Sequence, residues 1–586
     1  MTRIVIDEDE IRTRRLDVAA DDDLRVHGVI SVDDEDETIR FEFPTDGATI
    51  VNYGVIENTA DEGRAIVIKE EVGDTFNAVF DNRGEISSED DAIKIDTGDL
   101  VSGKLLIKNG ADGLIHSDIG QALDLADATG DFLSVVQNKG EITSGENDGV
   151  KIGGVGRVIN SGHISGGDDD GYSDGADGVS FEDGAKGVVR NTGLIEGDRH
   201  GVDAGEDSVV RVVNELGGVI MGHNGSGVGS DGSGTVVNYG KIVGSFSDSE
   251  GSDIHGTDVG EEDGGGPDGV NDGDGDGVDI DFEAHIFNYG VIKGVGSGGT
   301  GSDGLPNTSE GIAAGGGEIY NYEGARITGV DVGILIDDSS QGGAGVATLI
   351  DNQGLIKGGD GLAIRIIGDQ DDTIVNDGQI IGKGGVAIDF GGGDDTLVVK
   401  DDSEITGLTR GGEGDDTLDY SEFSEGARVN LTTGKATGTG GVEGFETVIG
   451  SDHDDRLVGD SNTNLLIGGD GDDFLASKGG NDTLIGGDGD DTFHIGSDGG
   501  AVVIQDFAQG ADKISLGKVF GLSNGELASS AFANGTEAQD AFDRIIYDAK
   551  TGNLFFDADG AGGADAIKIA TLSAGLDLGA DDFLIS

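Results

Sequence analysis

Carboxylates recur at a fixed spacing in the C-terminal third of the chain. The motif Gly-Gly-x-Gly-x-Asp-x-apolar is complete at 411–418, 468–475 and 486–493. Partial copies start at 390, 450, 459 and 477, so that five consecutive copies from 450 to 486 are each nine residues apart. Carboxylate and backbone carbonyl oxygens are the ligands that Ca²⁺ prefers, in sets of about six to eight. The spacing therefore predicts calcium binding.

Nine residues fit a six-residue turn followed by a three-residue strand, and two such units make one 18-residue coil. Every second unit then lies above its predecessor. This stacks Asp455, Asp473 and Asp491 on one edge, and Asn464 and Asp482 on the other. Carboxylates stacked about 4.8 Å apart repel one another, and a divalent cation between them turns this net repulsion into a net attraction. Because Asn464 is uncharged, we expect a weaker or missing ion beside it.

The other positions of the motif have structural roles. Glycine permits backbone conformations that turn carbonyls toward an ion. The apolar eighth position, as in Leu457, Leu475 and Phe493, is expected to fill a narrow core. Several Ca²⁺ ions are expected, and the predicted metal-site residues are Asp395, Gly411, Gly412, Gly414, Asp416, Asp455, Gly468, Gly469, Gly471, Asp473, Gly480, Asp482, Gly486, Gly487, Gly489 and Asp491.

A weaker metal candidate lies in an acidic insertion. Asp272, Asp274 and Asp276, with Glu283 at the twelfth position, fit the spacing of an EF-hand loop. However, Asp279 stands where that loop has a hydrophobic residue, and the flanking residues read as strand instead of helix. A calcium site of another kind and a solvated acidic loop both remain open.

Catalytic patterns are sparse, and we assign no catalytic residue and no organic cofactor. The best local cluster is Asp198-Arg199-His200 with Asp203, a set that can hold a uronate sugar. An Asp-Arg-His triplet is, however, more often a solvated turn. Residues 521–525 match Gly-x-Ser-x-Gly, but no strand or histidine accompanies them, and no His-Glu-x-x-His zinc motif occurs.

A second repeat occupies residues 46–390 and defines the elements there. Its motif, apolar-x-Asn-x-Gly-x-Ile, reads VNYGVI at 51–56 and FNYGVI at 287–292, and alternates with strand-like pieces such as DGVKI at 148–152. Both pieces alternate with period two, which is typical of short strands. A repeat of this length without a helix predicts one coil of a parallel β-solenoid. We expect each Asn to adopt a left-handed turn and to hydrogen-bond its copy in the next coil.

These patterns predict an all-β fold. A right-handed parallel β-helix or solenoid precedes a calcium-bound parallel β-roll and a small β-rich C-terminal domain. The predicted divisions are an N-terminal cap at 1–45, the solenoid at 46–390, the first repeat units and a spacer at 391–449, the β-roll at 450–495 and the C-terminal domain at 496–586.

The net charge of −80 disfavours a nucleic acid or an anionic membrane as partner. The chain has no Cys, so it forms no disulfide. No run approaches the about 20 apolar residues that a membrane span needs, so we expect no membrane insertion. Residues 1–23 lack the apolar stretch of a Sec-type signal, and we therefore expect an export signal elsewhere.

The nonapeptide block resembles the RTX, or haemolysin-type, calcium-binding repeats, whose fold is a parallel β-roll. The segments VIQDFAQGADKISL (503–516), 544–572 and DDFLIS (581–586) resemble the serralysin-like C-terminal domain, so that the resemblance covers about 390–586. It implies an extracellular or cell-surface protein, exported by the type I secretion machinery through an uncleaved C-terminal signal. It also implies a chain that folds only at extracellular Ca²⁺ concentrations.

Three functions fit these features. We favour a non-enzymatic, structural or adhesive surface protein, such as a surface-layer, matrix or filament component, with self-association or an extracellular polysaccharide as its contacts. The first alternative is an extracellular polysaccharide lyase or epimerase with an RTX tail. The second is a calcium-dependent glycan-binding module.

Overall fold

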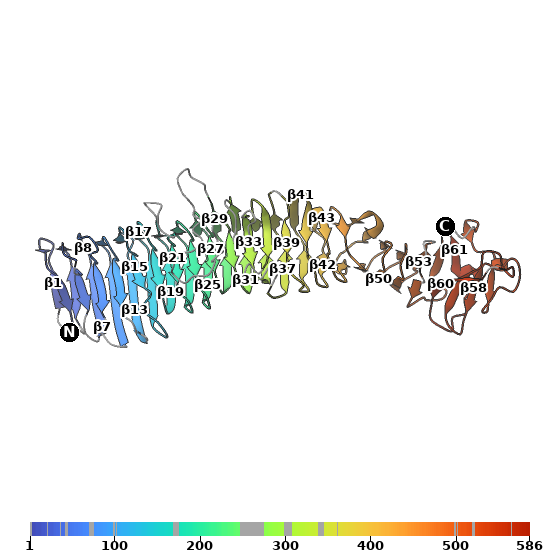
Figure 1. The fold of residues 1–586 in the computed structure, drawn as a ribbon, viewed down its shortest axis with the longest axis horizontal. Helices are drawn as coiled ribbons and strands as arrows, with labels where there is room; N and C mark the ends of the chain where they lie inside the picture. The colour runs from blue at the N-terminus through green and yellow to red at the C-terminus, as the bar shows by residue number, and fades with distance from the viewer. Residues whose placement is uncertain are drawn as a thin grey trace, which may run out of the picture. The chain divides into compact units, whose positions relative to one another are not determined.

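The computed structural model describes residues 3–19, 22–35, 37–41, 45–69, 75–97, 100, 102–167, 175–246, 275–297, 308–337, 345–359, 361–496, 500, 502–517, 522–563 and 565–586. These residues form β-strands and a few short 3-10 helices, such as η2 (Leu431–Thr433) (Figure 1). The chain divides into unit 1, which is Met1–Thr348 with Gly354–Ile367, and unit 2, which is Leu349–Gln353 with Gly368–Ser586. The five-part division made from the sequence stays a prediction.

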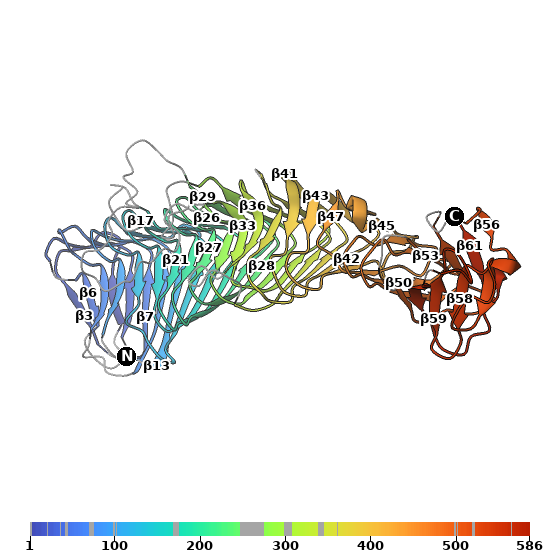
Figure 2. The same ribbon diagram turned by 45° about the vertical axis from the view of Figure 1, so that its right-hand side comes forward.

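Unit 1 is a stack of coils with three strands each. One coil holds β7 (Thr45–Asn52), β8 (Val55–Asn58) and β9 (Ile66–Lys69). The next coil holds β10 (Thr75–Asn82), β11 (Glu85–Ser88) and β12 (Ile93–Asp96). Each strand pairs in parallel with its counterpart one coil away. The same order repeats up to β34 (Gly317–Asn321), β35 (Arg326–Thr328) and β36 (Val332–Ile336) (Figures 1 and 2).

The period-two pattern decides which side chains enter the core of unit 1. In β10 the side chains of Phe76, Ala78 and Phe80 are buried, whereas those between them are half-buried. The register then places identical residues above one another in successive coils: Ile86 pairs with Ile56 on one side and with Ile115 on the other. Each coil therefore adds one layer of aliphatic and aromatic side chains to a continuous core, and burial of this apolar surface stabilises the stack.

Asparagines form the predicted ladder. The Nδ2 of Asn52 donates to the Oδ1 of Asn82 at 2.9 Å. Bonds of the same kind continue coil by coil through Asn109, Asn138, Asn160, Asn191, Asn214, Asn238, Asn288 and Asn321. From Asn52 to Asn288, each Nδ2 also donates to a backbone carbonyl of the next coil, as Asn52 does to Glu85. The buried amides are thus satisfied along the ladder.

The expected left-handed conformation of these asparagines was wrong. Among the described residues other than glycine, only Glu62 and Asp207 have a positive φ. Asn52 is instead the last residue of an extended strand, and its Oδ1 accepts a hydrogen bond from the N–H of Gly54, which turns the chain. Glycine is required there by close approach, because a Cβ on Gly54 would lie 2.0 Å from the carbonyl oxygen of Gly28.

Replacing Asn191 by Ala should destabilise unit 1 by about 3 kcal/mol. The change leaves the Nδ2 of Asn160 and the Oδ1 of Asn214 without their ladder partner, and each such buried group costs about 1–3 kcal/mol. Thr192→Ala, on the exposed neighbouring residue, is the matched control and should cost under about 1 kcal/mol. Thermal unfolding at fixed Ca²⁺ would measure both, and equal melting temperatures would show that the ladder does not stabilise the coils.

Unit 2 contains two facing stacks of short parallel strands. One includes β48 (Thr447–Ile449), β50 (Leu465–Asp470) and β52 (Thr483–Asp488). The other includes β49 (Arg456–Val458), β51 (Phe474–Ala476) and β53 (Thr492–Ile495). Strands in each stack recur every 18 residues, as the sequence predicted. Leu457, Leu475 and Phe493 are fully buried between the stacks and fill the core of this β-roll.

The last part of unit 2 departs from the coil pattern. Here β58 (Ile545–Asp548), β59 (Asn553–Phe556) and β60 (Ile567–Thr571) pair antiparallel. This sheet joins the roll because β60 pairs with β54 (Val502–Ile504). The C-terminal strand β61 (Phe583–Ile585) pairs with β55 (Lys513–Leu516). The all-β solenoid, β-roll and small β-rich domain of the predicted fold are therefore confirmed.

Candidate metal centre

The roll brings the predicted aspartates into rows. Asp455, Asp473 and Asp491 form the inner row, in which the N–H of Asp455 donates to the Oδ1 of Asp473 at 2.8 Å. The N–H of Asp473 donates in the same way to Asp491 at 3.0 Å. On the other edge, the N–H of Asn464 donates to the Oδ1 of Asp482 at 2.9 Å. Each carboxylate is buried and held in place by the coil before it.

The second carboxylate oxygen of these aspartates, Oδ2, is the candidate metal ligand. The Oδ2 atoms of Asp473, Asp482 and Asp491 are buried, and no hydrogen-bond donor in the described part of the chain reaches them. Asp455 differs, because its Oδ2 accepts a hydrogen bond from the N–H of Ser451. A buried carboxylate oxygen without a donor is costly unless a cation or a proton compensates it. An oxygen-only donor set of this kind fits a hard cation such as Ca²⁺.

The glycines of the motif make room for these carboxylates. A Cβ on Gly468 would lie 2.0 Å from the Oδ2 of Asp473, and a Cβ on Gly486 would lie 2.1 Å from the Oδ2 of Asp491. The next two glycines have a different role, since Gly469 and Gly471 have φ values of 121° and 119°. Glycines at these positions in the other copies also have a positive φ, which ranges from 78° to 152°: Gly412, Gly414, Gly480, Gly487 and Gly489.

Asp395 and Asp416 belong to a second row, upstream of the roll. The N–H of Asp395 donates to the Oδ1 of Asp416 at 2.9 Å, and both Oδ2 atoms are buried without a donor among the described residues. A Cβ on Gly411 would lie 2.3 Å from the Oδ2 of Asp416. The row continues to Asp372 and Glu446, because Asp372 donates its N–H to Asp395 and Asp416 donates its N–H to Glu446.

Asp372 and Glu446 were missed in the sequence. Asp372 stands in Asp-Asp-Thr-Ile at 371–374, which has the form of Asp-Asp-Thr-Leu at 394–397 and 415–418. That signal was available, but no glycine motif precedes it. Coils in this row are 395 − 372 = 23 and 416 − 395 = 21 residues long, so the nonapeptide spacing does not reach them. Glu446 carries no motif of its own.

Two further acidic residues extend the inner row. The N–H of Asp491 donates to the Oδ1 of Asp512 at 3.0 Å, and the sequence Gly510-Ala511-Asp512 keeps part of the motif. The carboxylate of Asp506 accepts hydrogen bonds from the N–H groups of Gly486 and Gly487 at 3.0 and 2.8 Å. Both residues therefore border the last repeat of the roll, and neither was predicted.

An outer row of carboxylates runs beside the inner one. Its members Asp454, Asp472 and Asp490 occupy the fifth position of the motif, which the sequence analysis treated as variable. The N–H of Asp472 donates to Asp454 at 3.0 Å, and that of Asp490 donates to Asp472 at 2.9 Å. These three side chains are exposed, in contrast to the inner row.

Burial makes ionisation of the inner-row carboxylates unfavourable. Burial, and after it the carboxylates of Asp455 and Asp491, raises the pKa of Asp473 to about 8. Burial likewise raises the pKa of Asp395 to about 8 and those of Asp416, Asp482 and Asp491 to about 6. The described residues contain no cluster of three or more His, Cys, Asp or Glu side chains arranged for a metal. A cation here would thus need backbone carbonyls besides the carboxylates.

The calcium-free roll should become more stable as the solution is acidified. Because the folded pKa values are raised above the ordinary Asp value of about 4, protonation favours the folded state. This contribution is fully present below about pH 4 and is lost as pH rises through about 6 to 8. In metal-free buffer, the folded fraction of the roll, measured by circular dichroism, should therefore rise from pH 8.5 to pH 5. Asp473→Asn should weaken that dependence, and a folded fraction that falls on acidification would contradict the assignment.

The weaker metal candidate is only partly described. Asp272 and Asp274 lie outside the described residues. Asp276 is buried, and its Oδ1 accepts a hydrogen bond from the N–H of Glu310 at 2.6 Å. Glu283 has a side chain that is 54% exposed and lies 3.7 Å from the Nε2 of His285. Asp276 and Glu283 are therefore in different environments.

The Asp198-Arg199-His200 cluster does not present its histidine to solvent. His200 is fully buried, and its Nδ1 accepts a hydrogen bond from the N–H of Ser226 at 2.9 Å. Burial raises the pKa of Asp203 to about 7 against the opposing effect of Arg199. A nearby cavity, lined by Val202 and Ile280 among others, has a volume of about 10 Å³, far below that of a ligand pocket. His200 is thus out of reach of a polysaccharide.

Comparison with known families agrees with the geometry of unit 2. Residues 399–584, about a third of the chain, match the family model of the Peptidase M10 serralysin C terminal. The C-terminal third therefore contains an RTX-type, serralysin-like domain, as the repeats indicated. No curated protein sequence matches the chain. Domains of this type bind calcium and are typical of extracellular proteins that are exported by type I secretion. None of the described helices is long and apolar enough to cross a membrane.

Proposed function

We propose that the protein is a calcium-dependent structural or adhesive component of an extracellular surface, such as a surface layer, a matrix or a filament. The observation that carries this proposal is the asparagine ladder of unit 1, in which successive coils from Asn52 to Asn321 repeat the same hydrogen bond. A stack of near-identical coils supplies length and stiffness. The burial of His200 argues against a polysaccharide-cleaving site at the best candidate cluster.

Calcium would have its effect in unit 2. We propose that Asp473, Asp482, Asp491, Asp395 and Asp416 bind it through their Oδ2 atoms, together with carbonyls of the glycine turns. Bound Ca²⁺ would supply positive charge between carboxylates that otherwise repel each other. Because cytosolic Ca²⁺ is scarce, the chain would be exported unfolded by the type I machinery, with its uncleaved signal in the last domain, and would fold outside.

The contacts of the folded protein would also involve calcium. The exposed outer row of Asp454, Asp472 and Asp490 presents carboxylates one coil apart. In a chain with a net charge of −80, another anionic surface can approach only when divalent cations screen or bridge the charges. We therefore propose a second copy of the chain or an acidic extracellular polysaccharide as the partner.

Imaging and binding experiments with the purified full chain would test this function. Electron microscopy and light scattering in millimolar Ca²⁺ should show assemblies or attachment to cell-surface material, and EGTA should abolish both. A protein that stays monomeric and unattached in both conditions would contradict the proposal. Degradation of alginate or pectin in the presence of Ca²⁺ would favour the enzyme instead, and selective signals on a glycan array would favour the binding module.

A further inference from the structure

Four consecutive coils of unit 1 each contribute one cation to the same outward face, and we call these four residues the cationic strip. The strip consists of Lys241 in β29 (Lys241–Ser245), Lys293 in β32 (Val291–Val295), Arg326 in β35 and Lys357 in β38 (Leu355–Lys357). Successive residues of a strand point to opposite faces, and the neighbouring Ile242, Ile292 and Ile327 are fully buried. The cations therefore point away from the core.

The register of the strands gives the strip a regular zigzag. The first and third cations share one column, because Lys241 and Arg326 both pair with Val291. The second and fourth cations share the neighbouring column, because both pair with Thr328. Coils stack about 4.8 Å apart, and positions two residues apart on a strand are separated by about 6.6 Å. One positive charge thus recurs at every coil, alternately in one column and in the other.

The sign of this face changes along unit 1. In earlier coils the same two columns carry acids, which are Glu57, Glu85, Glu141 and Glu196. Cations replace them from Lys241 to Lys357, although the chain has only 36 Lys and Arg residues against 116 Asp and Glu residues. A gathering of positive charge in so acidic a chain marks a surface that can hold an anion.

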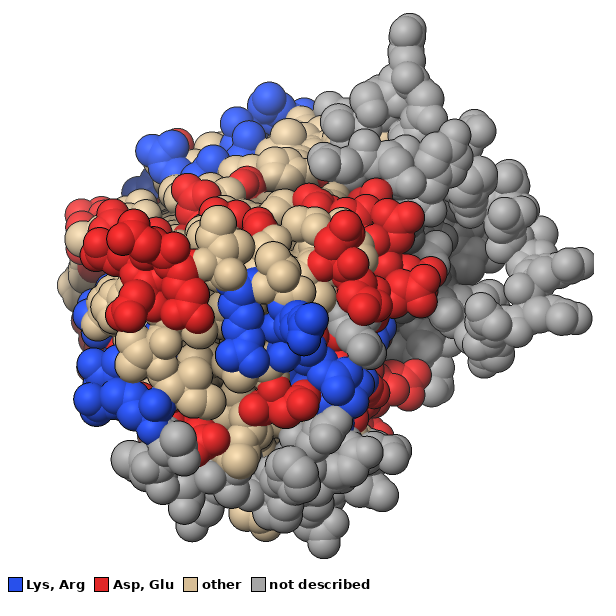
Figure 3. Space-filling model, turned by 90° about the vertical axis from the view of Figure 1, so that its left-hand side faces the viewer, with Lys and Arg blue, Asp and Glu red and all other residues tan. Residues whose placement is uncertain are grey.

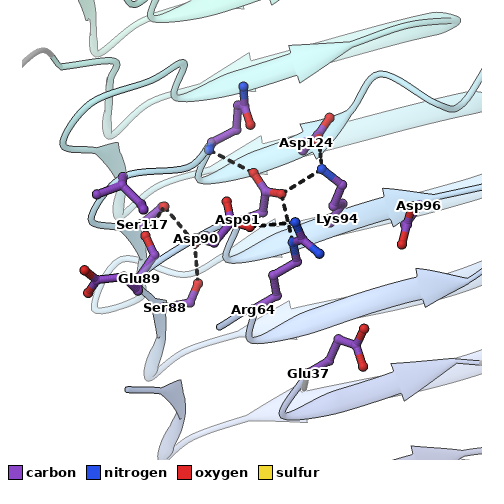
Figure 4. A network of polar contacts seen from close by, with 12 residues as sticks. Glu37, Arg64, Ser88, Glu89, Asp90, Asp91, Lys94, Asp96, Ser117 and Asp124 are labelled. Atoms are coloured by element: carbon purple, nitrogen blue, oxygen red, sulfur yellow. Dashed lines mark hydrogen bonds and ion pairs between the residues drawn. The ribbon is translucent and has the colours of Figure 1, made fainter. Parts of the chain in front are cut away.

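A cluster of cations near the N-terminus of unit 1 is, by contrast, neutralised by acids of the chain. The Nζ of Lys94 lies 2.9 Å from the Oδ2 of Asp91 and 2.7 Å from the Oδ2 of Asp124 (Figure 4). The end that carries β1 (Arg3–Ile6) likewise displays Lys and Arg side chains between acidic ones (Figure 3). No ion pair joins the cationic strip to an acidic side chain of the described residues. In the described structure, its charge is thus left for an anion from outside the chain.

A column of stacked tyrosines borders the strip. Tyr239, Tyr289 and Tyr322 follow the ladder asparagines of three consecutive coils, with ring centroids 4.6 and 4.1 Å apart. Tyr239 precedes Lys241 by only two residues, and Tyr239 and Tyr289 are 40% and 41% exposed. The neighbouring rings cover both faces of Tyr289, so it offers its edge and its hydroxyl group. This arrangement suits hydrogen bonds with sugar hydroxyls better than stacking with nucleic acid bases, which needs open ring faces.

We propose that the cationic strip and the tyrosine column bind one chain of an acidic polysaccharide directly. The cations pair with the carboxylates of the sugar units, and the tyrosine hydroxyls bond with sugar hydroxyls. Elsewhere on the acidic surface a polyanion needs bridging Ca²⁺, whereas here Lys and Arg supply the positive charge. This site rests on the function proposed above and gives it a second contact surface, apart from the outer row of unit 2.

Titration of the full-length protein with oligogalacturonate would test this surface. Because the cations bind the carboxylates directly, binding should persist in EGTA as well as in Ca²⁺, and NaCl should weaken it by screening. The methyl-esterified oligosaccharide has the same sugars without the charges, and it should bind at least about tenfold more weakly. Equal affinity for the charged and the esterified oligosaccharide would overturn the proposal.

Two triple variants would locate the site. The strip variant carries Lys241→Gln, Lys293→Gln and Arg326→Gln. The control variant removes the same charge from exposed positions in other coils, with Lys104→Gln, Lys139→Gln and Lys186→Gln. All six side chains are exposed, so both variants should keep the melting temperature of the unaltered protein. The strip variant should bind oligogalacturonate about tenfold more weakly, because three modest ion pairs are lost together, and the control should bind almost normally. Equal affinities of the two variants would contradict the assignment.

Further outcomes separate this site from the function proposed above. Attachment to cell-surface material in Ca²⁺, without binding of oligogalacturonate in EGTA, would overturn the site and leave the adhesive function in place. Binding through the strip, without assembly or attachment in electron microscopy, would support the site and contradict the adhesive function. Single-stranded DNA that binds the strip as tightly as oligogalacturonate would overturn the assignment to a polysaccharide.

Discussion

Removing Ca²⁺ from the full-length protein should unfold the roll and leave the early coils of unit 1 intact. The roll contains buried carboxylate oxygens that no described donor satisfies, as in Asp473 and Asp491. In unit 1, by contrast, the buried amides are paired along the asparagine ladder and Asp91 is paired with Lys94. Limited proteolysis in EGTA should therefore cut within about 391–586, while fragments that contain the coils of 45–246 survive.

Circular dichroism supplies the second readout of this experiment. Part of the β-signal should disappear in EGTA and return when Ca²⁺ is added in excess, because binding to the folded state alone stabilises that state. Mg²⁺ is the matched control, since it dehydrates reluctantly and demands a near-ideal octahedral site, and it should restore little of the signal. Equal protease resistance with and without Ca²⁺ would contradict the calcium-dependent folding of unit 2.

The substitution Asp473→Ala should reduce the number of bound Ca²⁺ ions by more than one. Asp473 lies in the middle of the inner row, where its Oδ1 accepts from Asp455 and its N–H donates to Asp491. The carboxylate of Asp473 therefore lies beside the turns that hold Asp455 and Asp491. Loss of this carboxylate should weaken Ca²⁺ binding at each of the two turns by about tenfold or more. Calorimetric titration of the full chain would count the lost ions.

Asp472→Ala is the control for that experiment. Asp472 is adjacent in sequence and equally acidic, but it is exposed and belongs to the outer row. Its removal should leave the number of tightly bound ions unchanged. If Asp473→Ala loses a single ion, or if both variants lose the same number, the row does not share ligands between neighbouring turns.

The fold of the roll was predictable because its period is constant. A nine-residue spacing leaves one register for each turn, so the stacking of Asp455, Asp473 and Asp491 followed directly from counting. The alternation of apolar residues likewise identified the strands of unit 1. The sequence did not indicate which glycines of the motif take a positive φ: Gly469 and Gly471 do, whereas Gly468 does not.

Contacts between coils of unequal length were not predictable in the same way. Asp276 meets Glu310 and Asp416 meets Glu446 only because the chain between them completes one coil, and coil lengths vary along the solenoid. The EF-hand spacing around Asp276 was a local pattern that competed with this long-range pairing. The left-handed conformation predicted for the asparagines was wrong for a related reason. The chain turns after Asn52 because the side-chain Oδ1 of Asn52 accepts a hydrogen bond from the N–H of Gly54, and not because Asn52 has a positive φ.

The most direct measurement is anomalous diffraction from crystals of the full-length protein grown with Ca²⁺. Anomalous peaks should lie beside the Oδ2 atoms of Asp473, Asp482 and Asp491, within the oxygen–calcium distance of about 2.3–2.6 Å. A roll that is ordered in such crystals, with no peak at these oxygens and with protein donors or protons satisfying them, would contradict the claim that calcium holds the stacked turns together.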